Sequence, residues 1–138
     1  MGNGQVLIGN TQGNQGSYLL AVAGSAVATS FTVKAVANWP DYVFKKDYSL
    51  PSLVDVKTYI DQNQHLPEVP SAQEVEKGGL NLGEMNQILM KKVEELTLYL
   101  IEKDEKEKQQ QNQLKTQQEE IDQLKQQVQL LINKSNKK

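Results

Sequence analysis

One stretch of the sequence decides the fold: residues 83–134, which read GEMNQILMKKVEELTLYLIEKDEKEKQQQNQLKTQQEEIDQLKQQVQLLINK. No glycine or proline follows Gly83 within it, so it predicts one continuous helix about 75 Å long. Apolar residues recur along it in a seven-residue repeat, which keeps one register from Leu89 to Leu131. The apolar a and d positions, here called the heptad stripe, are Leu89, Val93, Leu96, Leu100, Leu114, Ile121, Leu124, Val128 and Leu131. Such a stripe is typical of a left-handed coiled coil and needs partner helices, most simply those of other copies of the chain.

The middle of the repeat is polar, since core positions there carry Lys103, Glu107, Gln110 and Gln117. Polar core residues set the register and the number of strands at a cost in stability. Near the C-terminal end, β-branched Ile121 and Val128 at a, with leucine at d, favour two strands. A parallel arrangement gains slight support from Glu120 at g, which would face Lys125 at e of a neighbouring helix.

The composition of the chain leaves little material for a self-sufficient core outside this helix. Of the 138 residues, 38% are hydrophobic and 6% aromatic, so we expect the rest of the chain to complete its core across subunits. The net charge is −2 and no basic patch stands out, which argues against a nucleic-acid partner. No apolar run approaches the length of a transmembrane span, and the first residues lack the pattern of a signal peptide. Because strand-like sequence begins at once, we expect a fragment of a longer protein.

Residues 1–37 predict short β-strands. The apolar runs 5–8 and 18–22 are separated by glycine, asparagine and glutamine, which are turn-forming residues, and residues 26–36 alternate in a two-residue period. The side chains are small and the turns closely spaced. This suits strands that wrap around a threefold axis, as in a fibrous β-prism; a small β-meander packed on the rest of the chain is the alternative.

Residues 38–82 predict a collar of aromatic residues and short helices. Trp39, Tyr42 and Phe44 supply its main packing mass, or alternatively a surface that binds a ligand. Three N-capping signals follow, namely Ser52 with Asp55, Ser71 with Glu74, and Asn81 with Glu84. They predict a short helix after Ser52, a second over 72–76, and the start of the long helix.

The first turns of the long helix are apolar outside the stripe as well. The additional apolar residues are Ile88, Met90, Leu98 and Ile101. They predict a landing site for the short helices and the aromatic segment. We therefore expect residues 85–101 to lie inside the collar and the helix from 102 onward to be bare.

A series of short motifs occurs in a fixed order: WPDYVF at 39–44, YSLPSLVDV at 48–56, HLPEVPSAQEV at 65–75, NLGEMN at 81–86 and EELTLY at 94–99. Together they resemble a C-terminal module of tail-fibre-like and cell-surface proteins of Bacteroidetes bacteria and their phages. The resemblance covers roughly residues 18–101. That module is similar in placement to the intramolecular chaperone ends of phage tail fibres and endosialidases, which trimerise the fibre. The resemblance therefore implies a homotrimer at the C-terminal end of a fibre, outside the cell or on a virion.

No catalytic, cofactor-binding or metal-binding constellation stands out, and we do not expect an enzyme. The chain has no cysteine, and His65 is its single histidine. Self-cleavage, known in the related chaperones, needs a serine nucleophile; Ser17, Ser25 and Ser30 lie in no recognisable cleavage pattern.

The sequence thus predicts an elongated α+β chain with a short β segment at 1–37, a small helical collar at 38–82, and a long parallel coiled coil at 83–138. The expected partners are copies of itself, in a homotrimer with a dimer as the second choice. The expected function is structural: trimerisation and registration of a fibre. The alternative is a receptor- or glycan-binding tip that uses Trp39, Tyr42 and Phe44.

Overall fold

The computed structural model describes residues 5–9, 18–34 and 39–136, and the chain divides into two compact units, Met1–Lys34 and Ala35–Lys138. In the first unit, strand β1 (Val6–Ile8) pairs in parallel with β2 (Leu20–Val22), with Val6 opposite Leu20. The predicted runs 5–8 and 18–22 are confirmed as strands. Gly9 turns the chain out of β1 at φ +86°, where an added Cβ would lie 3.3 Å from the Ala23 carbonyl oxygen.

The predicted strand over 26–36 is wrong for residues 26–34, which carry no regular structure; Ala35 and Val36 lie outside the described residues. Val27 is fully exposed and Phe31 is 75% exposed. An alternating pattern needs a neighbouring strand to take up its backbone hydrogen bonds, and the described residues of this unit pair only β1 with β2. The alternation at 26–34 therefore has no partner strand among the described residues.

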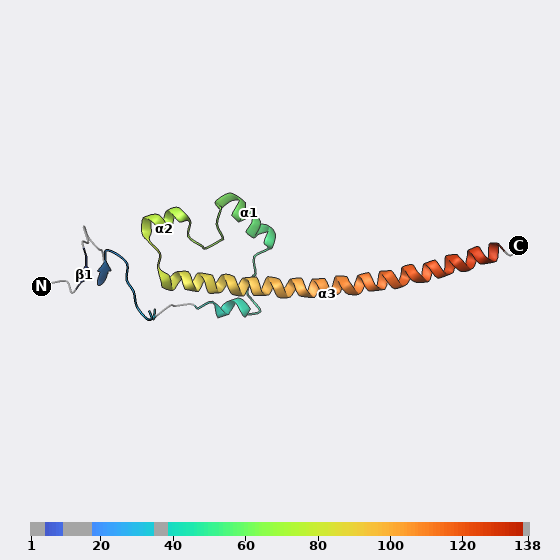
Figure 1. Cartoon of the computed structure of the whole chain (residues 1–138), viewed down its shortest axis with the longest axis horizontal. Helices are drawn as coiled ribbons and strands as arrows, with labels where there is room; N and C mark the ends of the chain where they lie inside the picture. The colour runs from blue at the N-terminus through green and yellow to red at the C-terminus, as the bar shows by residue number, and fades with distance from the viewer. Residues whose placement is uncertain (1–4, 10–17, 35–38, 137–138) are drawn as a thin grey trace. The chain divides into compact units, whose positions relative to one another are not determined.

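The second unit contains one long helix and three short ones (Figure 1). They are the 3₁₀-helix η1 (Pro40–Phe44), α1 (Leu53–Asn63), α2 (Ala72–Gly78) and α3 (Leu82–Ser135). The single long helix is confirmed, and its 54 residues span about 80 Å. No helix in the described part of the chain is long and apolar enough to cross a membrane.

Each predicted N-cap is present. The Ser52 side chain accepts a hydrogen bond from the Asp55 amide, and Ser71 forms a complete capping box with Glu74. The Asn81 side chain accepts hydrogen bonds from the Gly83 and Glu84 amides and starts α3. These caps satisfy amide groups that have no partner within the first helical turn, which is why short-range sequence signals located the helix starts correctly.

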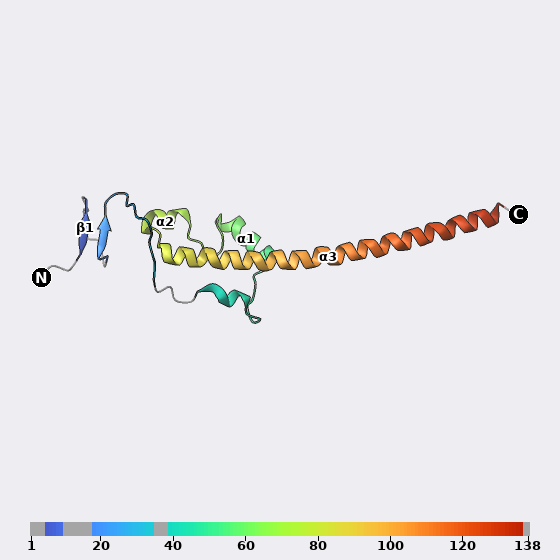
Figure 2. The same cartoon turned by 60° about the horizontal axis from the view of Figure 1, so that its bottom comes forward.

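The short helices lie on two sides of α3. Figures 1 and 2 show η1 along one side, with α1 and α2 on the other. Residues 51–81, which contain α1 and α2, are here called the arch, because no Cα atom of either helix comes within 8 Å of α3. Of the predicted landing residues, Ile88 and Leu98 are half-buried, while Met90 and Ile101 remain exposed. The prediction that helices α1 and α2 pack directly on α3 is therefore wrong, whereas the predicted packing of the aromatic segment on α3 is confirmed for η1.

The packing between η1 and α3 differs from the expected aromatic collar. Pro40 and Val43 are the fully buried side chains of η1, whereas Trp39 is 46% and Phe44 55% exposed and Tyr42 is half-buried. A 3₁₀-helix has three residues per turn, so positions 40 and 43 share one face and turn toward α3 together. The aromatic residues were thus wrongly assigned as the main buried mass within one chain.

Candidate self-association surface

The heptad stripe lies in solvent along the whole of α3. All of its residues, from Leu89 to Leu131, are 46–66% exposed. From Leu100 onward, every described residue of the helix is exposed. The predicted bare lower rod is thus confirmed for residues 102–136, and the stripe is an uncovered apolar face of the single chain.

The opposite face of the upper helix is covered by its own chain. Glu94 and Glu95, at b and c of the heptad, are buried, and η1 is the element packed on α3. Glu94 Oε2 has no hydrogen-bond partner among the described residues. Burial, with a further contribution from the charge of Asp41, raises the pKa of the Glu94 carboxyl above its ordinary value. The chain therefore accepts a costly buried carboxyl on the covered face and leaves the a and d face open.

A polar network joins three segments on this side of α3. The Tyr48 hydroxyl donates to Glu95 Oε1 at 2.5 Å, and Lys92 Nζ donates to Glu95 Oε2 at 2.9 Å. Lys91 Nζ donates to both carboxylate oxygens of Glu68, at 2.6 and 2.7 Å. Here this set is called the Glu95 network. Because Tyr48 precedes the arch and Glu68 lies inside it, the network ties both to the upper helix.

Burial and the neighbouring Glu95 carboxylate raise the pKa of Tyr48 well above its ordinary value. Partial burial lowers the pKa of Lys91, but the hydrogen bond and charge of Glu68 outweigh this effect, so that the pKa is raised overall. Lys91 Nζ also lies 5.9 Å from the centroid of the Tyr42 ring, which itself packs 5.9 Å from Tyr48. The raised pKa values keep the Tyr48 phenol and the Lys91 ammonium protonated at neutral pH, as donors in the network.

A second tie holds the start of the arch. The Tyr99 hydroxyl donates to the Pro51 carbonyl oxygen at 2.6 Å, over 48 residues of separation. Burial is the first cause of the raised pKa of Tyr99, followed by the charges of Glu95 and Glu102. The arch is thus attached to α3 at Pro51, at Glu68 and, through the chain itself, at Asn81.

Between these attachments the arch leaves an apolar groove of about 340 Å³. Its apolar lining comes from both sides, with Leu53, Val56, Leu66 and Pro67 of the arch facing Leu89, Val93 and Leu96 of α3. Leu53 is 62% exposed and Val93 56% exposed, so the two walls do not close on one another. Stripe residues therefore form one wall of the groove.

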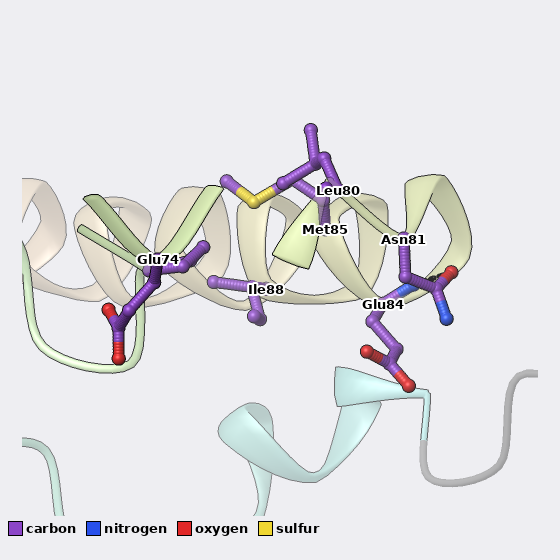
Figure 3. A pocket seen from close by; sticks show the side chains of 8 residues that line it. Glu74, Leu80, Asn81, Glu84, Met85 and Ile88 are labelled. Carbon is purple, nitrogen blue, oxygen red and sulfur yellow. Dashed lines mark hydrogen bonds between the residues drawn. The ribbon is translucent and has the colours of Figure 1, made fainter. Parts of the chain in front are cut away.

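A smaller hollow of about 220 Å³ lies between α2 and the first turns of α3. Figure 3 shows Leu80, Met85 and Ile88 at its apolar part, with the carboxylate of Glu84 directed away from Leu80 and Met85. Both hollows lie beneath the arch, on the g side of the heptad stripe.

The stripe was predictable from the sequence, whereas the Glu95 network and the hydrogen bond from Tyr99 to Pro51 were not predicted. The available signal was the charged quartet of Lys91, Lys92, Glu94 and Glu95, which interrupts an otherwise apolar part of α3. Of the predicted binding residues Trp39, Tyr42 and Phe44, Tyr42 is the one that lies beside the network, through Tyr48 and Lys91. The groups of His, Asp and Glu in the described residues form no cluster suited to a metal ion.

Comparisons with protein families, with curated proteins and with solved structures gave no match to this chain.

Proposed function

We propose that this chain is a self-association module in which three copies form a parallel coiled coil through the heptad stripe. The observation that carries the proposal is the continuous exposure of the stripe on a helix of 54 residues. An isolated helix gains only modest stability in water, and most helices in proteins are stabilised by burying an apolar face. Partner helices would supply that burial along the whole length of α3.

The collar supports this proposal by its position. It covers the b and c positions with η1 and holds the arch on the g side, so that neither element occupies the a and d face. A module built to fold alone would place its own elements on the most apolar face. Here the chain leaves that face for a helix from elsewhere.

The choice of three copies rests on two arguments. The motif series of residues 39–99 resembles a trimeric fibre end, and the β1–β2 pair exposes its apolar side chains, such as Val6 at 55% and Leu20 at 60%. Two strands of three residues are not stable alone in water, so further strands from other copies would help them. Against this, Ile121 and Val128 at a favour a dimer, and we keep the dimer as the alternative.

We place the module at the C-terminal end of a phage tail fibre or a similar surface protein, outside the cell or on a virion. There it would bring three chains together and set their register, so that weakly stable strands on the N-terminal side can pair. This placement is supported by the motif resemblance alone.

Light scattering at several concentrations tests the association. We expect a mass near three times the chain mass of 15.5 kDa that does not change on dilution. A mass near twice the chain mass would replace the trimer with the dimer, and a monomer would refute self-association.

A receptor-binding tip is the second candidate, because Trp39 and Phe44 remain about half exposed beside the half-buried Tyr42. Trp39 is the only tryptophan, so its fluorescence reports on this patch alone. Titration with soluble neutral and acidic oligosaccharides should shift that emission in the parent and leave a Phe44→Ala variant unresponsive. An unchanged emission at millimolar oligosaccharide would count against glycan binding.

A further inference from the structure

The groove beneath the arch has a volume of about 340 Å³ and a mainly apolar lining, and the described residues leave it open. Polar contacts at its two ends join the arch to α3: the Tyr99 hydroxyl bonds to the Pro51 carbonyl, and Lys91 bonds to Glu68. These contacts fix the span of the arch over α3. The groove therefore has a set width and a mainly apolar lining, with no occupant among the described residues.

We infer that helix α3 of a second copy occupies this groove, so that the arch of each chain clasps the helix of its neighbour. The inference rests on the proposed self-association and specifies how it is completed: the collar is shared between subunits. The arch, in this arrangement, is an intermolecular element, although it belongs covalently to one chain.

The groove and the heptad stripe share residues. Leu89, Val93 and Leu96 form a wall of the groove and are also consecutive core positions of the heptad. In a coiled coil each a or d side chain inserts among four residues of the facing helix. A helix that covers Val93 must therefore lie alongside the arch and contact its lining.

The groove lies on the g flank of the heptad stripe. Lys92 and Tyr99, which line it, occupy g positions. In a parallel, in-register coil the g flank of one helix faces the e flank of the next, so Thr97 of a second copy would lie opposite Lys92. The arch on the g side then reaches over the e side of the neighbouring helix.

The same geometry accounts for Met90, an apolar residue at e that is 39% exposed and lies outside the stripe. Its partner across a parallel interface is the g residue Met85, five positions earlier. Met85 lines the smaller hollow together with Leu80 and Ile88 (Figure 3). Met90 of a second copy would thus contact this hollow. That contact would bury an apolar side chain that is exposed in the single chain.

Cysteine cross-linking tests the inference directly, because the chain has no cysteine of its own. The variant Val56→Cys with Thr97→Cys places one thiol in the arch and one on the e flank, away from its own groove. Treatment with a short bis-maleimide at low protein concentration should give covalent dimers and trimers on a denaturing gel. The matched control, Val56→Cys with Gln111→Cys, uses an e position two heptads lower and should give no covalent ladder.

Two outcomes separate this inference from the proposed function. If light scattering shows the oligomer but only single-chain bands appear after cross-linking, the clasp is refuted and self-association stands. If Val56→Cys with Leu96→Cys then links within one chain, the arch instead closes on its own helix. A monomer by light scattering refutes both. Circular dichroism of each variant, matched to the parent spectrum, confirms that the compared proteins are folded.

Discussion

The upper and lower parts of α3 carry the same heptad stripe but are stabilised in different ways. Over residues 82–101 the helix has a covered back face, the Glu95 network and a groove beside its stripe. From residue 102 to residue 136 every side chain is exposed. The ion pairs described there are all local, such as Lys106 with Glu102 and Lys108 with Asp104. Such solvent-exposed pairs contribute little to stability. The upper part is thus partly built within one chain, while the exposed lower part would gain tertiary stability only from the partner helices proposed above.

The polar middle of the heptad repeat lies between the upper and lower parts of the stripe. Lys103 and Glu107 occupy core positions, yet their charged groups lie 3.5 Å apart within one helix. Local pairing keeps the helix continuous where the stripe offers no apolar contact. If the stripe associates as proposed, its upper and lower parts would differ in strength, and the following variants separate their contributions.

The largest effect is expected from charges in the upper stripe. Val93→Asp with Leu96→Asp would place carboxylates in the association interface and in the groove, at a cost of several kcal/mol. We expect the oligomer to dissociate to monomers at micromolar concentration by light scattering. The control, Gln109→Asp with Asn112→Asp, adds the same charge at outer positions and should leave the mass unchanged. Equal behaviour of the two variants would mean that the upper stripe is not an interface.

A matched pair at the C-terminal end isolates the lower stripe. Leu130 and Leu131 are 61% and 66% exposed, so the single chain does not distinguish them, but only Leu131 is a core position. Leu131→Asp should lower the thermal midpoint and weaken association, whereas Leu130→Asp should do neither. The size expected for loss of a buried leucine near a fraying end is about 2 kcal/mol. A comparable loss in both variants would refute the heptad register.

Removal of the Glu95 carboxylate should loosen the upper part alone. Glu95→Ala leaves the Tyr48 hydroxyl and Lys92 without their acceptor in a part-buried site, at a cost of about 1–3 kcal/mol. Hydrogen exchange should increase at residues 40–44 and in the first turns of α3. Exchange in residues 114–131 should stay at its parental rate, and an increase there would show that the two parts unfold as one.

Tyr99→Phe removes a single hydrogen bond, from the Tyr99 hydroxyl to the Pro51 carbonyl oxygen. We expect a loss of about 1 kcal/mol of unfolding free energy, measured by urea denaturation. Thr97→Ser serves as the control, because it changes a side chain on the e flank of α3 and keeps its hydroxyl. A Tyr99→Phe variant with parental stability would show that the start of the arch is held by other contacts.

The smallest effect is a dependence on pH through Glu94. Its pKa is raised in the folded chain, chiefly by burial, so folding favours the protonated form and the unfolding free energy falls as pH rises from the ordinary pKa through the raised one. Glu94→Gln should therefore raise the thermal midpoint at pH 7. Below about pH 4, where the carboxyl is protonated in both states, the difference should vanish. A midpoint difference independent of pH would assign the effect to packing.

Local and periodic features were predictable from the sequence because neighbouring residues determine them. The three N-caps, the strands at 6–8 and 20–22, and the continuous α3 each depend on residues a few positions apart. The alternation at 26–34 did not predict a strand correctly, because a strand also needs a neighbouring strand to pair with. Whether such a neighbour is present cannot be read from the local sequence. The buried face of η1 was missed because hydrophobic size suggested Trp39 and Phe44, whereas three-residue periodicity selects Pro40 and Val43.

The sequence by itself determined the heptad register of α3, the starts of its helices and the identity of its exposed apolar stripe, because helical periodicity places each side chain on a known face. Only the tertiary structure decided which face the collar covers and that the arch stands away from α3 over a groove. Those features depend on contacts between distant residues, Tyr99 with Pro51 and Lys91 with Glu68, whose pairing no local pattern specifies.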